Sequence, residues 1–120
     1  MKTHSAKAKG RRLQNEVRDI LLREWSSVLH PDDVRVAIMG ESGTDIKLSP
    51  AARRYIPYAI ECKNQEHLNI WDALQQAAEN AADGATPALI FRRNRSNTYV
   101  ALPLDAFLAL FPKPPSTNPS

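Results

Sequence analysis

The 120-residue sequence is poor in several residue types, and each scarcity excludes a class of protein. Its single cysteine, Cys62, excludes an internal disulfide, and the three histidines show no zinc-ligand spacing with it. No run of eighteen apolar residues is present, so we expect no membrane-spanning helix. The basic N-terminus also lacks the apolar stretch of a signal peptide. Together these absences predict a soluble cytoplasmic protein.

Charge is abundant but unevenly distributed. The net charge is +3, from sixteen Lys and Arg against thirteen Asp and Glu. Residues 1–23 carry seven basic and two acidic side chains, a net charge of +5, so the remaining residues sum to −2. The sequence therefore predicts a basic N-terminal segment attached to a mildly acidic body.

Hydrophobic periodicity predicts a mixed α/β fold. Apolar residues recur at three- and four-residue steps in some segments, as in a helix, and form short β-branched runs in others, as in strands. The expected helices span residues 11–28, 70–81 and 105–111, and the expected strands span residues 34–39, 45–48, 58–63, 87–91 and 98–102. We interpret the order as helix, three strands, helix, two strands, helix, with one mixed central sheet of about five strands flanked by helices.

The same pattern predicts a single domain with two flexible ends. Residues 1–9 are interpreted as a flexible basic arm, residues 10–111 as one domain, and residues 112–120 as a disordered proline-rich tail. The large aromatic side chains fall at core positions of the expected elements and are interpreted as packing residues: Trp25, Trp71, Phe91, Phe107 and Phe111.

The expected strand 58–63 carries the most informative chemistry. Alternation places Ile60 and Cys62 on one face, and Glu61 and Lys63 on the other. Asp45 begins a neighbouring strand after a glycine-containing turn, so two carboxylates and a lysine can converge at one edge of the sheet. The plainer alternative for Glu61 and Lys63 is an ordinary solvated strand face.

This grouping suits metal-assisted hydrolysis of phosphodiesters. Mg²⁺ prefers oxygen ligands, usually one or two carboxylates, with water and substrate phosphate completing the shell. We expect Asp45 and Glu61 to be metal ligands, the backbone carbonyl of Cys62 to be a third, and Lys63 to stabilise the transition state. Mn²⁺ is expected to substitute for Mg²⁺.

Gly43-Thr44-Asp45-Ile46, followed by Ala59-Ile60-Glu61-Cys62-Lys63, resembles the D…ExK signature of the PD-(D/E)XK nuclease superfamily. Thr44 stands where that motif has proline. The layout is similar to that of archaeal-type Holliday junction resolvases and phage-encoded nucleases, and the likeness covers residues 9 to about 103. The resemblance implies a restriction-endonuclease-like core and a bacterial, archaeal or phage-infected host cell.

The resemblance also implies further site residues. It adds Glu16 of the first helix to the metal and catalytic sets, places Ser42 close to the site, and predicts a catalytic glutamine in the second helix. Gln76 is preferred over Gln75, although the sequence leaves that choice open. On a helical wheel Glu16 lies beyond the edge of the apolar stripe, where it could reach the site or pair with Arg12 or Arg23. The expected DNA-binding residues, most of them cations that complement phosphates, are Lys7, Lys9, Arg11, Arg12, Ser42, Arg92, Arg93 and Arg95.

We therefore expect a Mg²⁺-dependent endonuclease that acts on branched or duplex DNA, such as a Holliday junction. The small size favours structure-selective cleavage by a homodimer. Two alternatives remain open, namely a non-catalytic DNA-binding module and a protein-interaction domain on the same fold.

Overall fold

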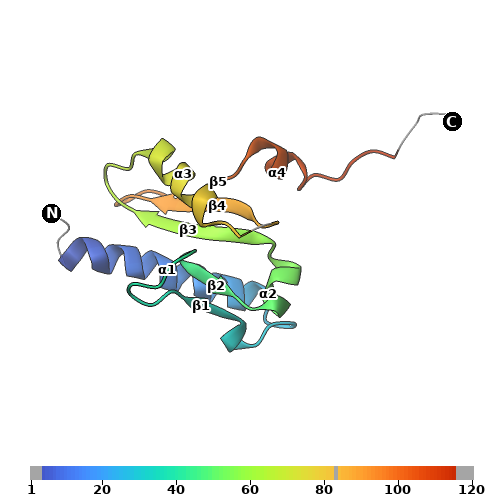
Figure 1. The fold of residues 1–120 in the computed structure, drawn as a ribbon, viewed down its shortest axis with the longest axis horizontal. Helices are drawn as coiled ribbons and strands as arrows, with labels where there is room; N and C mark the ends of the chain where they lie inside the picture. The colour runs from blue at the N-terminus through green and yellow to red at the C-terminus, as the bar shows by residue number, and fades with distance from the viewer. Residues whose placement is uncertain (1–3, 83, 116–120) are drawn as a thin grey trace.

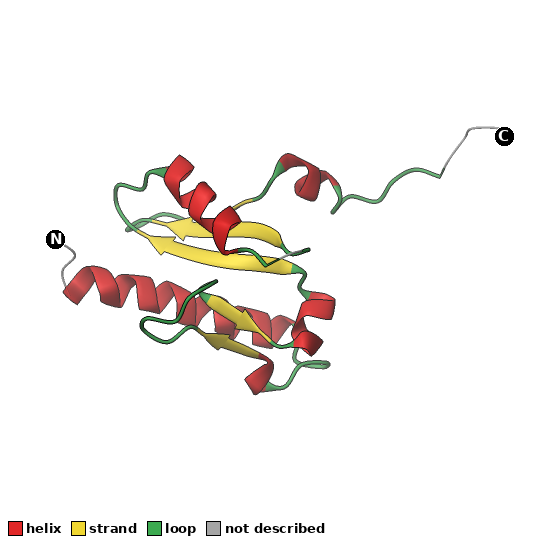
Figure 2. Cartoon of the chain, in the orientation of Figure 1, coloured by secondary structure: helices red, strands yellow, loops and turns green. Residues whose placement is uncertain are grey.

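The computed structural model describes residues 4–82 and 84–115, and its element order is close to the predicted one (Figures 1 and 2). The helices are α1 (His4–Glu24), α2 (Pro50–Tyr55), α3 (Ile70–Asn80) and α4 (Leu104–Leu108), with a short 3₁₀ helix η1 (Pro31–Asp33). The strands are β1 (Val34–Val36), β2 (Ile46–Leu48), β3 (Tyr58–Asn64), β4 (Thr86–Arg92) and β5 (Tyr99–Ala101). Within the described ranges no helix is long and apolar enough to cross a bilayer.

Helix α1 is longer at its N-terminus than the apolar pattern indicates. It begins at His4, so residues 4–9 are helical and not a flexible arm, while residues 1–3 lie outside the described residues. Alanine, lysine and arginine dominate its first turns and have high helix propensity, which explains the extension. Leu13 and Val17 are buried and anchor the helix to the body.

The strands form two sheets where one sheet of about five strands was expected. β1 and β2 are an antiparallel pair, whereas β3 pairs in parallel with β4, which pairs antiparallel with β5. The hairpin meets β3 through Asp45, whose N–H donates to the carbonyl of Ile60 at 3.2 Å. The Asp45 carboxylate then accepts the N–H of Cys62, which in a continuous ladder would bind a backbone carbonyl. The polar junction at Asp45 therefore replaces a continuous β2–β3 ladder.

Helix α2 was not predicted, because residues 49–57 were interpreted as a proline-bounded connection. Ser49 caps this helix, its hydroxyl accepting the N–H of Ala52 at 3.1 Å, and Pro50 occupies the first turn. A serine followed by proline is a helix-start signal in its own right. The buried Ala52 then fixes the helix against the core.

The two long helices cover opposite faces of the larger sheet (Figure 1). α1 packs on β3 and β1, and α3 packs on β4 and β3. Both faces of β3 are therefore buried, and on the α3 side the small residues Ala59, Ala73 and Ala77 let the helix approach. The core on the α1 side is formed by larger residues: Leu13, Val17, Leu29, Val34, Val36, Ile46, Ile56 and Ile60.

The C-terminal region differs from the prediction in its packing. α4 ends at Leu108, earlier than the expected helix 105–111, and residues 112–115 have no regular structure. Residues 116–120 of the predicted disordered tail lie outside the described residues. Phe107 and Phe111 are about half exposed and Trp71 is 77% exposed, so the interpretation of these three aromatics as core residues is wrong.

Candidate active site

Glu61 and Lys63 share one face of β3, as the two-residue spacing requires. That face lies under α3: Glu61 contacts Asn80, and Lys63 lines a small cavity together with Ala73 and Gln76. The Glu61 side chain is only 3% exposed, and Lys63 is half-buried. The alternative of an ordinary solvated strand face is therefore wrong for Glu61.

Asp45 reaches β3 from the loop that precedes β2. Its Oδ2 accepts the N–H of Cys62 at 2.8 Å, which fixes the carboxylate beside the backbone of Glu61. The Thr44 hydroxyl stabilises this turn by donating to the carbonyl of Ile46 at 2.8 Å. Gly43 has a φ of 90°, a conformation that favours glycine, so the approach to Asp45 depends on a residue without a side chain.

The Asp45 carboxylate lies close enough to Glu61 to shift the pKa of Glu61. The pKa of Glu61 is raised to about 7, first because burial disfavours the charged form and second because of repulsion from Asp45. Asn80 and Lys63 act in the opposite direction, the first through a hydrogen bond and the second through its charge. Asn80 and Lys63 therefore do not fully offset the burial of Glu61 and its repulsion from Asp45.

Asn80 is a site residue that the sequence reasoning missed. Its Nδ2 donates to Oε1 of Glu61 at 3.0 Å from the last turn of α3. The signal was present in the spacing, since Ala73, Ala77 and Asn80 follow one another at four- and three-residue steps on the buried face. An asparagine that extends a stripe of buried alanines is a candidate partner for a buried acid.

A cavity of about 530 Å³ opens beside these groups and is called the polar cavity here. Lys63 lines it from β3 and Asp45 from the loop before β2, and Lys7, Arg11 and Gln14 line it from α1. In Figure 1 this is the end where α1 begins and β3 finishes. Asp45, one member of the acidic pair, therefore adjoins a space with several basic side chains.

Cys62 contributes its backbone here and not its thiol. The side chain belongs to the hydrophobic core, where burial and then the two nearby carboxylates raise the pKa of the thiol. The thiol therefore stays protonated and is not suited to act as a nucleophile. Its N–H positions Asp45, as described above.

A comparison with protein families identifies the fold family. A family model described as "Phage putative PDDEXK endonuclease" matches residues 5–113, a span that includes all the residues described above. The chain belongs to this PDDEXK endonuclease family. No curated protein and no solved structure matches it. The family match confirms the predicted PD-(D/E)XK resemblance, and the closer likeness to archaeal-type resolvases stays a prediction.

Nucleases of the PDDEXK class generally use divalent metals, and the acidic pair fits such an ion. One oxygen of each carboxylate is held by a protein donor, Oδ2 of Asp45 by Cys62 and Oε1 of Glu61 by Asn80, so both groups are oriented. Across residues 4–82 and 84–115, no three His, Cys, Asp or Glu side chains gather as a metal-binding cluster. Backbone carbonyl groups, water and substrate oxygens would therefore have to complete the coordination shell.

Glu16, an expected metal ligand of the PDDEXK site, is engaged elsewhere. Its carboxylate accepts two hydrogen bonds from the Arg92 guanidinium, at 2.5 and 3.1 Å. This ion pair lowers the pKa of Glu16 and ties α1 to the end of β4. Glu16 was expected to reach the metal site or to pair with Arg12 or Arg23, and the structure instead pairs it with Arg92.

The two glutamines of α3 are distinguished by their surroundings. Gln76 lines the small cavity that also contains Lys63 and Gln65, whereas Gln75 donates to the carboxylate of Glu79 at 3.1 Å. Gln76 is therefore the glutamine near Lys63. Its catalytic role in this PDDEXK chain stays a prediction.

The predicted DNA-binding residues gather at the same end of the molecule. Some of them are paired with other residues of the protein, and others are exposed. The Lys9 ammonium pairs with Glu66 at 3.3 Å, and Glu66 also accepts the N–H of Asn94, so α1 and the β4–β5 turn are held together. Arg92 is committed to Glu16, and Arg11 donates to the carbonyl of Ala37 at 2.9 Å. The side chains with substantial exposure are Lys7, Arg11, Arg12, Ser42, Arg93 and Arg95.

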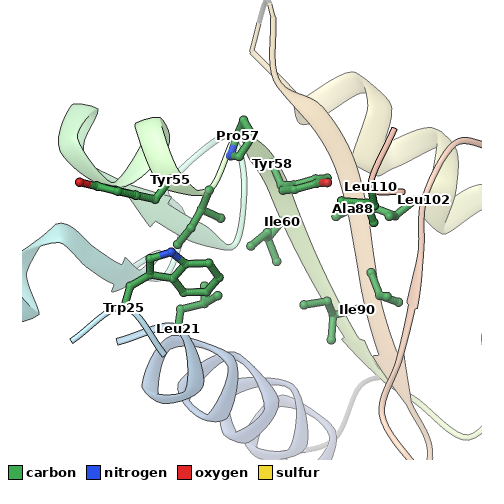
Figure 3. A pocket seen from close by; sticks show the side chains of 12 residues that line it. Leu21, Trp25, Tyr55, Pro57, Tyr58, Ile60, Ala88, Ile90, Leu102 and Leu110 are labelled. Atoms are coloured by element: carbon green, nitrogen blue, oxygen red, sulfur yellow. The ribbon is translucent and has the colours of Figure 1, made fainter. Parts of the chain in front are cut away.

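A second cavity of about 490 Å³ has the opposite character and is called the apolar cavity here (Figure 3). α1, β3, β4, β5 and the segment after α4 contribute to it, and among the described residues that line it none is charged. The lining side chains shown in Figure 3 include Leu21, Trp25, Tyr58, Ile60, Ile90 and Leu110. This cavity offers no group for hydrolytic chemistry.

Proposed function

We propose that this chain is a Mg²⁺-dependent endonuclease that hydrolyses phosphodiester bonds of DNA. The observation that carries the proposal is the close pair formed by Asp45 and the buried Glu61. Lys63 lies beside this pair and, with Asp45, lines the polar cavity. Membership of the PDDEXK endonuclease family supports the same chemistry. A divalent cation, when bound, activates water and offsets the negative charge that develops on the phosphate.

In this proposal Asp45, Glu61 and the Cys62 carbonyl hold the cation, and Mn²⁺ can replace Mg²⁺. Both carboxylates are oriented in advance by hydrogen bonds, which reduces the reorganisation needed on binding. Lys63 is half-buried on the same strand face, where its ammonium can stabilise negative charge on the transferring phosphate. Gln76 lies close enough to Lys63 to assist in positioning the substrate.

The basic side chains around the polar cavity would bind the phosphates that flank the cleaved bond. Lys7 and Arg11 line the cavity from α1, and Arg93 and Arg95 lie on the turn that Glu66 holds near Lys9. Each phosphate contact adds affinity that falls as salt concentration rises. The proposed substrate is branched DNA, such as a Holliday junction.

The test is cleavage of a synthetic four-way junction and of plain duplex in Mg²⁺ or Mn²⁺. Wild-type protein should cut the junction, whereas Glu61→Ala and Lys63→Ala should lose at least a hundredfold in rate. Glu79→Ala on the exposed side of α3 and Lys113→Ala are the matched controls and should keep full rate. No divalent-dependent cleavage above that of the site variants would refute the proposal and favour a binding module.

We also propose that the enzyme works as a homodimer, which supplies one site for each of two strands. Support comes from the apolar cavity and from the neighbouring exposed side chains Val100, Leu104, Phe107, Leu110 and Phe111. A charge in this region should prevent association. Sedimentation should therefore give a dimer for wild type and a monomer for Leu110→Glu, and a wild-type monomer at micromolar concentration would contradict the dimer.

A further inference from the structure

The loop between β1 and β2 exposes two large apolar side chains next to the polar cavity. Ile38 is 69% exposed and Met39 is 82% exposed, the largest exposed fraction among the large hydrophobic residues of the described chain. Single exposed apolar residues are common on protein surfaces, but an adjacent pair at the tip of a loop beside a candidate active site is a different case. We call Ile38 and Met39 the apolar tip.

The loop that carries the apolar tip is held in place by a network of polar contacts. The Glu41 carboxylate accepts hydrogen bonds from the Arg35 guanidinium, at 3.0 and 2.8 Å, and from the N–H of Ile38 at 3.0 Å. The N–H of Glu41 in turn donates to the carbonyl of Ile38 at 3.0 Å. Ile38 and Met39 are thus presented on an ordered backbone, which lowers the conformational cost of using them in binding.

The apolar tip lies beside groups that suit DNA. Met39 lines the polar cavity together with Asp45 and Lys63, and Arg11 bonds to the carbonyl of the residue that precedes Ile38. In Figure 1 the loop lies at the same end of the molecule as the start of α1. A ligand that occupied the cavity would meet cations at its phosphates and apolar side chains immediately next to them.

Nucleic acid is the ligand class that combines these two chemistries. Proteins that bend or open DNA insert apolar side chains such as Ile and Met between base steps, while Lys and Arg bind the phosphates on either side. The cost of opening a step is smallest where stacking is already lost, as at a branch point. A fixed apolar tip therefore favours DNA with an interrupted stack over continuous duplex.

We propose that Ile38 and Met39 form a wedge that inserts at an unstacked base step and so selects branched DNA. Insertion at the step holds the neighbouring phosphate at the mouth of the polar cavity, close to Asp45 and Lys63. This inference rests on the proposed function for its substrate, and it assigns the choice of branched over continuous DNA to two side chains outside the acidic pair.

The experiment uses a four-way junction with 2-aminopurine, a base analogue whose fluorescence rises on unstacking, at the branch point. Binding is measured in EDTA, so that no cleavage is needed. Wild-type protein should raise the fluorescence. The double variant Ile38→Ala/Met39→Ser should abolish this rise and should reduce the binding preference for junction over duplex about tenfold. Met39→Leu, which keeps the apolar volume, should behave as wild type. Val28→Ser, at an exposed apolar position after the C-terminal end of α1, is the matched control.

Failure of the wedge proposal and failure of the proposed DNA hydrolysis give different results. If the double variant gives the same fluorescence rise and the same preference as wild type, or if wild type binds the junction without a rise, the wedge is wrong even when the enzyme cuts DNA. If wild type does not cut DNA in Mg²⁺ but its fluorescence response depends on the apolar tip, the wedge stands and the proposed hydrolysis is wrong. Binding to no DNA at all overturns the wedge as well.

Discussion

The polar and apolar cavities have nearly the same volume and share strand β3, but their linings have opposite chemistry. Ile60 projects into the apolar cavity, whereas its neighbour Glu61 projects to the other face and meets Asn80. Strand alternation alone separates a hydrophobic surface from a carboxylate across one peptide unit. The strand can therefore supply both the packing and the candidate chemistry of a small domain.

The two faces of β3 also contribute to stability with opposite sign. On the α1 side, β3 buries apolar surface that stabilises the domain, whereas on the α3 side it buries a carboxylate whose pKa is raised to about 7. Burial of an ionisable group next to a like charge opposes folding when the group is charged. Such groups are typical of functional sites, where the unfavourable charge prepares the protein to bind a cation.

The largest expected effect comes from removing the charge of Asp45 while keeping its hydrogen bond. Asp45→Asn retains an oxygen for the Cys62 N–H, so thermal unfolding should change little. The rate of junction cleavage should fall by about 10³, since the proposed metal ligand loses its charge. Asp105→Asn on α4 is the control. A variant that kept more than a tenth of the wild-type rate would argue against Asp45 as a ligand.

The second prediction contrasts the two neighbours on β3 through the pH dependence of stability. Because the folded pKa of Glu61, about 7, is above its ordinary value of 4.5, its favourable contribution is complete below pH 4.5 and is lost as pH rises through 7. In EDTA, Glu61→Gln should therefore match wild type at pH 4 and exceed it by up to about 3 kcal/mol at pH 8.

Ile60→Ala is the matched comparison for that experiment, because it removes core volume without a charge. It should lower the free energy of unfolding by about 2–4 kcal/mol at both pH values. Urea unfolding followed by tryptophan fluorescence measures all three proteins. If the stability of wild type and of Glu61→Gln depended on pH in the same way, the raised pKa of Glu61 would be wrong.

A smaller effect is expected from Asn80, which contacts the proposed metal ligand Glu61 and not the metal site itself. Asn80→Ala frees Oε1 of Glu61, so the Mn²⁺ concentration for half-maximal cleavage should rise about 10–100-fold. The rate at saturating Mn²⁺ should change much less, which a general loss of structure would not produce. Gln75→Ala, on the exposed side of α3, is the control and should leave the half-maximal concentration unchanged.

The smallest effect is expected from Glu16, and it decides between the two interpretations of that residue. Glu16→Gln weakens a partly exposed ion pair with Arg92, so the cost in stability should be about 1 kcal/mol or less. Calorimetric titration with Mn²⁺ should give an affinity within twofold of wild type. A tenfold loss of affinity would instead support the metal-ligand role implied by the family resemblance.

Much of the architecture could be predicted because the signals are local. The periodicity of α3, the β-branched runs and the glycine turn before Asp45 each depend on neighbouring residues, and the structure confirms the elements that they indicate. Helix α2 had a local signal at Ser49-Pro50 that the prediction overlooked. The start of α1 depended on helix propensity without an apolar stripe, which hydrophobic periodicity does not detect.

The candidate site was predictable only in part, for a physical reason. Asp45, Glu61 and Lys63 could be selected because their types and spacing suit a hard cation, and the structure places the two carboxyl groups within reach of each other. The partner of Glu16 lies far away in the sequence, on β4, and no local pattern indicates Arg92. Asn80 contributes a donor to an acid nineteen positions away, a pairing that depends on how α3 crosses the sheet.

The sequence by itself determined which residues alternate along β3, where helices and turns occur, and which acids and bases were available for phosphodiester chemistry. These properties depend on residue type and on the fixed geometry of helices and strands. The tertiary structure decided the pKa of Glu61, the division into two sheets at Asp45, and the pairing of Glu16 with Arg92. Each of these requires groups distant in sequence to meet. The β1–β2 hairpin brings Asp45 to β3, and the packing of α1 and α3 on opposite faces of the sheet brings Glu16 to Arg92 and Asn80 to Glu61.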